Sequence, residues 1–140
     1  MGQPHGIGIV GLGVISAQYL ETLGAHPGVR IAATADLDTA RAAAVAERFD
    51  GCRALTVDEL VADPSVQTVL NLTIPAAHAE VALAALRHGK NVFGEKPLAP
   101  AMAEARRSCR PLPRPHGRAV HPTPCSAPGS RPPARPWTRA

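Results

Sequence analysis

Residues 7–16 read Ile7-Gly8-Ile9-Val10-Gly11-Leu12-Gly13-Val14-Ile15-Ser16, and this stretch decides the fold. The apolar run at its start predicts a short strand that ends at Gly11. Residues 14–23 then predict a helix, for which Gly24 can serve as the C-terminal stop. A strand, a tight turn and a helix in this order are typical of the first unit of a parallel α/β fold.

The rest of the first two thirds of the chain repeats this alternation. Strands are expected at residues 29–35, 53–55, 68–72 and 91–94, and helices at residues 39–49, from the capping-box pattern at residues 56–59, at residues 75–89 and from residue 100 onward. Strand and helix alternate with short links, which predicts a doubly wound parallel sheet covered by helices on both faces.

The glycine turn carries the first functional signal. Residues 11–16 have the first two glycines of a dinucleotide-binding fingerprint but Ser16 at the third position. The fingerprint needs a tight turn, a close backbone approach to a pyrophosphate, and a helix start whose N–H groups face the phosphates. The alternative is a glycine turn that only joins a strand to a helix. The candidate cofactor-binding residues here are Gly11, Leu12, Gly13, Val14 and Ile15.

Asp36 ends the second predicted strand, about 20 residues after the fingerprint. A carboxylate at that place can accept hydrogen bonds from both hydroxyls of a ribose and repels a 2′-phosphate. Asp36 therefore favours NAD over NADP, with NADP still possible. The alternative role is the N-cap of the following helix, for which Asp38 competes.

The first 107 residues resemble the cofactor domain of the Gfo/Idh/MocA family, which includes glucose-fructose oxidoreductase and inositol dehydrogenase. The matching pieces occur in the family's order: the fingerprint at 11–16, Asp36, Asn71-Leu72-Thr73-Ile74-Pro75 with His78, and Glu95-Lys96-Pro97. The resemblance implies a Rossmann-type domain of an NAD(P)-dependent oxidoreductase. Such an enzyme transfers a hydride between a nicotinamide cofactor and a sugar, polyol or related alcohol.

The resemblance also implies roles for the segment around residues 72–78. In the family, residues like Leu72, Thr73 and Pro75 lie against the adenosine and the nicotinamide ribose, and His78 follows on the next helix. The simpler interpretation of Thr73 and Pro75 is a strand-to-helix turn, and both interpretations can hold together. His78 is more often structural than catalytic.

Two further roles are implied for the residues after the fifth predicted strand. Glu95 would contact the nicotinamide side, and Lys96 would be the catalytic residue that faces the substrate hydroxyl. An ammonium there stabilises the alkoxide that develops as the hydride leaves. The alternative is a solvated Glu-Lys pair before a proline.

The composition bears on compartment and partners. Three cysteines without a CxxC pair do not suggest a disulfide framework, the start of the chain lacks a secretory pattern, and no stretch has about 18 consecutive apolar residues. We therefore expect a cytoplasmic protein with a small-molecule substrate and without a metal, nucleic-acid or membrane partner. The resemblance implies that full-length relatives are homo-oligomers.

The composition changes after Arg107. Nine basic and eleven acidic residues precede this point, whereas residues 108–140 contain six arginines, nine prolines and no acid. Such a segment cannot bury enough apolar surface to offset its ordering entropy. The sequence therefore predicts a dinucleotide-binding domain at 1–107, a disordered basic Pro/Arg-rich tail at 108–140, and a sheet incomplete at its C-terminal edge, without a sixth strand.

A frameshift is our hypothesis for this change. When the codons possible from residue 122 onward are reread in a shifted frame, they permit PDTVLGAGLQTAR, which resembles the family's continuation. The alternatives for the tail are a zinc site at Cys109, His116, His121 and Cys125, and phosphate binding by the arginines, both less favoured than a solvated tail. The second functional hypothesis is a non-catalytic nucleotide-binding module, or an inactive truncated product.

Overall fold

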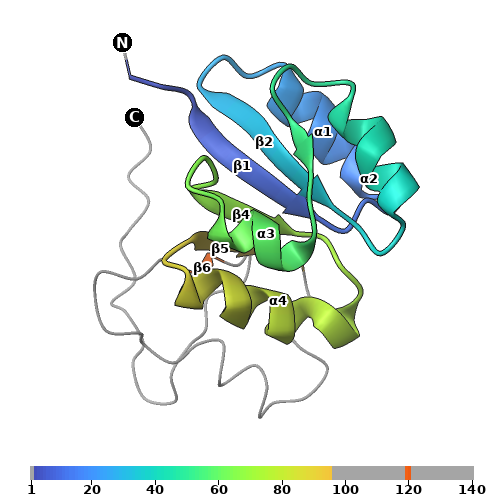
Figure 1. The fold of residues 1–140 in the computed structure, drawn as a ribbon, viewed down its shortest axis with the longest axis vertical. Helices are drawn as coiled ribbons and strands as arrows, with labels where there is room; N and C mark the ends of the chain where they lie inside the picture. Colours follow the sequence, from blue (N-terminus) through green and yellow to red (C-terminus); the bar gives the residue numbers. More distant parts are fainter. Residues whose placement is uncertain (1, 96–118, 121–140) are drawn as a thin grey trace, which may run out of the picture.

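The computed structural model describes residues 2–95 and 119–120, which form one parallel sheet with four helices (Figure 1). The strand order is β3-β2-β1-β4-β5-β6. The strands are β1 His5–Val10, β2 Val29–Ala35, β3 Arg53–Ala54, β4 Thr68–Asn71, β5 Asn91–Gly94 and β6 Ala119–Val120. The helices are α1 Ser16–Gly24, α2 Thr39–Ala46, α3 Val57–Ala62 and α4 Pro75–Arg87. The predicted doubly wound Rossmann-type sheet is confirmed.

Most of the helices and strands that the sequence predicts are present in the structure, with small changes at their ends. The expected bounds of β2 and β5 are those of the structure, and α3 starts with the predicted capping box of Thr56 and Glu59. The second helix is shorter than expected, because Arg48 and Phe49 make hydrogen bonds to the carbonyls three residues before them and end α2 in a tighter turn.

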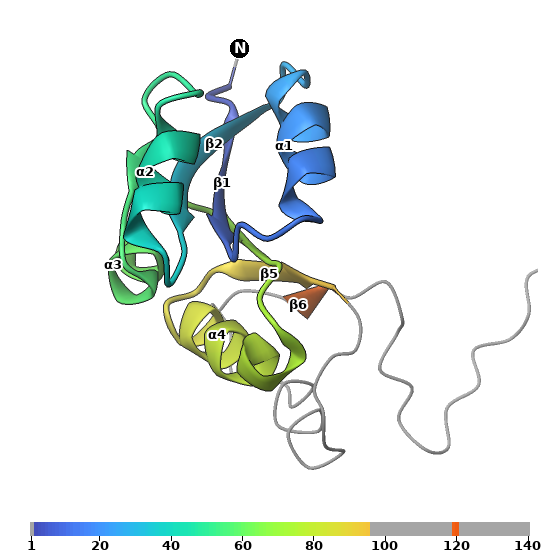
Figure 2. The same ribbon diagram turned by 90° about the vertical axis from the view of Figure 1, so that its right-hand side faces the viewer.

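Two apolar layers cover the two faces of the sheet (Figures 1 and 2). On one face Ile7 and Ile9 of β1 belong to a cluster with residues of α1 and α2, such as Leu20 and Ala42. On the other face Val10 belongs to a cluster with residues of α3 and α4. Successive residues of a strand point to opposite faces, so this division follows from the apolar run that ends at Gly11.

The strand order reverses between β1 and β4. The chain moves outward from β1 through β2 to β3, then crosses to β4 on the other side of β1. In open α/β sheets ligands bind beyond the carboxyl ends of the strands at such a switch point. The carboxyl ends of β1 and β4 are therefore the place to examine for a binding site.

β6 corrects one expectation. The sequence predicts a sheet without a sixth strand, yet Ala119–Val120 pair in parallel with Val92 and Phe93 of β5. The open edge of β5 offers unpaired backbone groups, and a β-branched residue such as Val120 favours an extended backbone. β6 has two residues against four in β5, so the sheet narrows at this edge.

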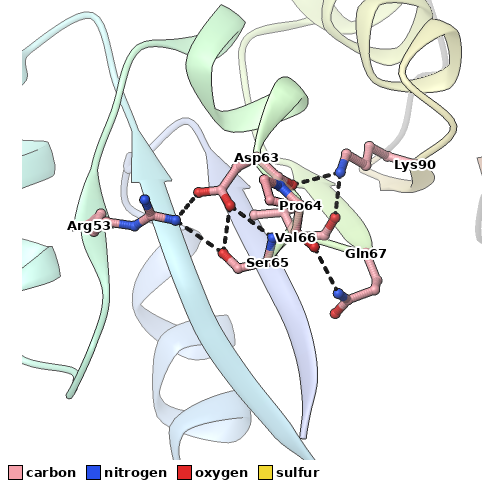
Figure 3. Close-up of polar contacts among 7 residues, drawn as sticks. All are labelled: Arg53, Asp63, Pro64, Ser65, Val66, Gln67 and Lys90. Atoms are coloured by element: carbon pink, nitrogen blue, oxygen red, sulfur yellow. Dashed lines mark hydrogen bonds and ion pairs between the residues drawn. The ribbon is translucent and has the colours of Figure 1, made fainter. Parts of the chain in front are cut away.

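The amino ends of the strands are joined by a polar network (Figure 3). Lys90, which is buried, donates from Nζ to the carbonyl oxygens of Asp63 at 2.6 Å and Val66 at 2.8 Å. The Asp63 carboxylate accepts from Arg53 and from both the N–H and the hydroxyl of Ser65. These bonds fasten the segment between α3 and β4 to its neighbours.

Burial and charge act on the two ionisable groups in the middle of this network. Burial lowers the pKa of the Lys90 ammonium, and the negative charge of Asp63 opposes that shift. Burial alone would raise the pKa of the Asp63 carboxyl. The hydrogen bonds from Ser65 and the positive charges of Arg53 and Lys90 outweigh burial and lower that pKa.

Two kinds of feature, a membrane-spanning helix and a metal-binding cluster, are both absent from residues 2–95 and 119–120. No helix in these ranges combines the length and the apolar character that crossing a membrane requires. Within the same ranges, no three His, Cys, Asp or Glu side chains gather as they would around a metal ion.

Candidate functional site at the carboxyl ends of β1, β2, β4 and β5

The two glycines of the turn between β1 and α1 have different surroundings. Gly11 has φ +89°, and a Cβ added to it would lie 2.8 Å from the carbonyl carbon and oxygen of Leu72 and from the nitrogen of Thr73. A Cβ added to Gly13 would meet no atom within 4 Å. Gly11 is therefore needed for packing against the turn after β4, whereas Gly13 leaves open space beside the backbone.

Ser16 fills the third position of the fingerprint with a hydrogen bond. Its side chain is buried, and its hydroxyl donates to the carbonyl oxygen of Gly13 at 2.6 Å. This bond closes the turn from inside. The departure from the third glycine is therefore accommodated, as the small size of serine predicts.

Helix starts differ in how they are capped. Asp38 caps α2 through a hydrogen bond from the Arg41 N–H, and Thr56 caps α3. The N-cap residues of α1 and α4 are Ile15 and Ile74, and neither makes a side-chain hydrogen bond to its helix. At α1 the N–H groups of Ser16 and Ala17 bond to backbone carbonyl oxygens, and Pro75 at the start of α4 has no N–H. The positive end of each helix dipole favours an anion, and these two starts flank the switch point between β1 and β4.

Asp36 lies at the end of β2 and reaches the glycine turn. Its Oδ2 accepts a hydrogen bond from the Leu12 N–H at 2.6 Å, and its Oδ1 accepts one from the Asp38 N–H at 2.8 Å. The guanidinium of Arg41 lies 3.5 Å from Oδ1 and 3.4 Å from Asp38. Since Asp38 is the N-cap of α2, the cap role that competed for Asp36 is taken by its neighbour.

The turn between β4 and α4 is held by a buried asparagine and a buried histidine. Asn71 donates to the carbonyl oxygen of His78 at 2.9 Å, and its Oδ1 accepts from the hydroxyl of Thr73 at 2.6 Å. His78 Nε2 lies 2.6 Å from the carbonyl oxygen of Thr73, which can only accept, so this nitrogen carries the proton. Pro75 is the first residue of α4, and Leu72 is buried in the core.

Four large apolar side chains of the described residues are exposed, and all lie at the carboxyl ends of the strands. Val14 and Ile15 follow β1, Leu37 follows β2 and Ile74 follows β4. Val14 and Leu37 are almost fully exposed. Apolar side chains gathered around a few polar groups are typical of a small-molecule site.

Sequence reasoning did not name Leu37, and it named Asn71 and Ile74 only as members of the family-like segment, without a role. Leu37 and Ile74 each come two residues after a predicted strand, and an apolar residue at that place is the signal that could have given them a role. Asn71 is a polar residue inside an apolar strand, which predicts a buried side chain with a specific partner.

Glu95 follows β5 and contacts α1. Its backbone N–H donates to the carbonyl oxygen of Asn71 at 3.3 Å, and its Oε1 accepts the hydroxyl of Tyr19. The contact joins the end of β5 to the helix that follows the glycine turn. Lys96 and Pro97 lie outside the described residues, as do the four candidate zinc ligands of the tail.

The fold and these features fit a dinucleotide. The open space at Gly13 and the start of α1 suit a pyrophosphate, the Asp36 carboxylate suits a ribose, and exposed apolar side chains flank both. Together with the strand order, they define the class of the molecule: a dinucleotide-binding Rossmann domain.

Comparison with known proteins gives the family. The model of the Gfo/Idh/MocA oxidoreductase family, described as an NAD-binding Rossmann fold, matches residues 5–121. The chain belongs to this family. The match extends beyond Arg107, where the sequence predicts the end of the domain, and the division at that residue stays a prediction.

Individual relatives agree with the family. Inositol 2-dehydrogenase 2 of Saccharopolyspora erythraea is 40% identical over 95 residues, which are 66% of this chain and 28% of that protein. The structure of myo-inositol dehydrogenase from Lactobacillus casei in complex with NAD(H) and myo-inositol has a TM-score of 0.71 at 27% identity, and covers 76% of this chain and 32% of that one.

A further solved structure is that of KijD10, a 3-ketoreductase from Actinomadura kijaniata, in complex with NADP and TDP-benzene. Its TM-score is 0.68 at 33% identity, over 76% of this chain and 33% of that one. These relatives act on small molecules, with NAD or NADP as cofactor. The chain spans about a third or less of the length of each relative.

Proposed function

We propose that this chain binds NAD at the carboxyl ends of β1, β2 and β4 and serves hydride transfer between the nicotinamide and a sugar, polyol or related alcohol. One observation supports this most directly. Gly13 has open space beside its backbone, its neighbour Leu12 bonds to the carboxylate of Asp36, and α1 starts three residues later without a side-chain cap, as a site for a pyrophosphate and a ribose needs.

Each group of residues has a task in this proposal. The turn at Gly11 and Gly13, with Val14 and Ile15 at the helix start, holds the pyrophosphate. Asp36 accepts hydrogen bonds from the ribose hydroxyls and disfavours a 2′-phosphate, so NAD is the preferred cofactor and NADP the weaker one. The rigid turn around Thr73 and Pro75 forms the opposite wall, and Glu95 lies on the nicotinamide side.

When bound, the nicotinamide ring supplies the acceptor for a hydride. The alcohol must also give its hydroxyl proton to a base. We propose that Lys96 faces the substrate oxygen and stabilises the negative charge that develops on it as that proton leaves. Lys96 directly follows Glu95 in the sequence, and this adjacency to a residue proposed for the nicotinamide side supports the role proposed for Lys96. His78 supports the wall from inside, because its ring is buried and bonded to Thr73.

The substrate class rests on the relatives. Inositol 2-dehydrogenase 2 is among the proteins with the highest identity, and the Lactobacillus casei enzyme was solved with myo-inositol. We propose a polyol or sugar of this size as substrate, in a cytoplasmic protein without a nucleic-acid or membrane partner. Homo-oligomers are proposed for the longer relatives, and cell fractionation tests the compartment.

Cofactor binding is the decisive experiment. The chain is titrated with NADH and with NADPH, and binding is followed by nucleotide fluorescence. Gly13→Ala should abolish most binding, because its Cβ enters the pyrophosphate space, yet it should unfold in urea like the parent, since no atom lies near that Cβ. Gly2→Ala, also at a glycine with open surroundings but at the other end of β1, is the matched control. An unaltered affinity of the Gly13 variant would contradict the proposal.

Turnover is measured separately from binding. Oxidation of myo-inositol and related polyols is followed by NADH absorbance, with Lys96→Ala as the variant expected to lose turnover while keeping the cofactor. Binding without turnover in the parent chain would favour the second hypothesis, a nucleotide-binding module without catalysis.

A further inference from the structure

Tyr19 links two parts of the site that are far apart in the chain. Its hydroxyl donates to Oε1 of Glu95 across 76 positions of sequence. Its ring also packs edge-on against Phe93 of β5, with centroids 6.4 Å apart and planes at 63°. The helix that starts at the pyrophosphate turn therefore contacts both the last part of β5 and the residue just after it.

The direction of this hydrogen bond is fixed by charge. The hydrogen bond to Glu95, then burial, then the negative charge of that carboxylate raise the pKa of Tyr19 to about 12. The phenol therefore stays protonated throughout the neutral range and acts as the donor. A carboxylate only accepts, so the Tyr19 hydroxyl is the donor to Glu95.

Backbone and side chain of Glu95 are thus held from two sides. The backbone N–H bonds to β4 through the carbonyl oxygen of Asn71, and the carboxylate bonds to α1 through Tyr19. A glutamate side chain with no such partner samples many rotamers, and ordering it when a ligand binds lowers affinity. Because Tyr19 already holds the side chain of Glu95, that side chain does not have to be ordered when the cofactor binds.

We infer that Tyr19 is a positioning residue for the nicotinamide half of the cofactor site and acts through Glu95. This inference rests on the proposed function, because it takes Glu95 to lie on the nicotinamide side. It predicts an effect confined to one half of the dinucleotide. In the proposed function the pyrophosphate and the adenosine contact the glycine turn and Asp36, whereas the Tyr19 hydroxyl bonds to Glu95.

The test compares two ligands. NADH carries the nicotinamide, whereas ADP-ribose has the adenosine, the pyrophosphate and a ribose without it. Tyr19→Phe keeps the ring and its contact with Phe93 and removes only the hydroxyl. It should weaken NADH binding roughly three- to tenfold, as expected when one side chain has to be ordered on binding, and leave ADP-ribose binding unchanged in calorimetry.

Thr22→Val is the matched control on the same helix. It removes an exposed hydroxyl that donates to the carbonyl oxygen of Gln18 within α1, and both ligands should bind as they do to the parent. Glu95→Ala should weaken NADH binding by a similar factor, and Tyr19→Phe added to it should cause no further loss. Independent, additive losses would overturn the inference.

The two possible failures differ in their results. If the parent chain binds neither NADH nor ADP-ribose, the proposed function fails. If it binds both, and Tyr19→Phe weakens both alike or neither, the proposed function stands and the positioning role is wrong. An equal loss for both ligands is what a displaced α1 would cause, and it therefore separates a structural role from a positioning one.

Discussion

The two ends of the sheet differ in which groups are bonded to each other and which are left exposed. At the amino ends, Lys90, Asp63, Arg53 and Ser65 satisfy one another and two backbone carbonyls (Figure 3). At the carboxyl ends, α1 and α4 start without side-chain caps, and large apolar side chains are exposed.

This difference separates stability from binding within one small domain. The side chains of the network at the amino ends bond to each other and contribute to folding. The helix starts and the exposed apolar side chains at the carboxyl ends contribute less to folding and can bind a ligand. Substitutions at the two ends should therefore change different measured quantities, and each prediction below tests that separation.

Gly11→Ala should have the largest effect on stability. It is an exception to the separation of stability from binding, because it should lower stability although it lies at the carboxyl ends of the strands. Gly11 lies at the carboxyl end, yet its left-handed φ and its contact with the turn after β4 make it part of the packing. Strain and overpacking together should lower the free energy of unfolding by about 3 kcal/mol. Urea unfolding checks this, with Gly13→Ala as the control at the same turn. Equal stability of the two variants would contradict the close approach to Leu72.

Lys90→Met should come next, with an effect on stability alone. The substitution leaves the carbonyl oxygens of Asp63 and Val66 without their donor, which should cost about 2 kcal/mol in urea unfolding. NADH affinity should not change, because the site is at the other end of the strands. Arg87→Met removes one exposed positive charge of α4 and is the control. A loss of cofactor affinity in the Lys90 variant would show that the two ends are coupled.

Asp36→Ala should have the reverse effect, on binding more than on stability. Without the carboxylate, NADH binding should weaken about tenfold, close to 1.4 kcal/mol. NADPH should lose less, because repulsion of its 2′-phosphate is also removed and Arg41 lies close by. Asp38→Ala is the matched control: it removes the cap of α2 and should lower stability by about 1 kcal/mol without changing the preference between the two cofactors. Equal losses for both cofactors would count against the ribose role.

The smallest predicted effect concerns pH. The pKa of Asp63 is lower in the folded chain than in the unfolded one, so the unfolded chain binds more protons as the pH falls below about 4, the usual value of an aspartate. The stability from Asp63 is present above that pH and is lost as the pH falls through the folded pKa. Asp63→Asn should flatten this acid loss in urea unfolding measured between about pH 5 and 3, whereas Asp58→Asn, an exposed neighbour on α3, should not.

Much of the fold was predictable from local pattern. The apolar strands, the capping box at Thr56 and the proline at the first position of α4 depend on neighbours close in the chain, and all three are confirmed. The short β6 was not predicted. Its pairing depends on the open edge of β5, which lies about 25 residues away along the chain and leaves no trace in the residues around Val120.

The residues of the candidate site also fall into those that local sequence could predict and those that required the structure. Gly11, Gly13 and Asp36 could be predicted because their spacing follows from one strand-helix-strand unit. The partners that fix the site come from elsewhere in the chain: Leu72 against Gly11, and Tyr19 against Glu95. No spacing in the sequence reveals contacts between separate units, so those pairs required the structure.

The hydrogen bonds that hold the turn after β4 have a consequence for how binding would proceed. Asn71, Thr73 and His78 are bonded to one another by protein groups alone. A turn that is already formed does not have to change its conformation when the cofactor binds. The free and bound forms of the protein should therefore superpose closely at residues 71–78. Association should then occur in a single kinetic step, at a rate set by diffusion and orientation.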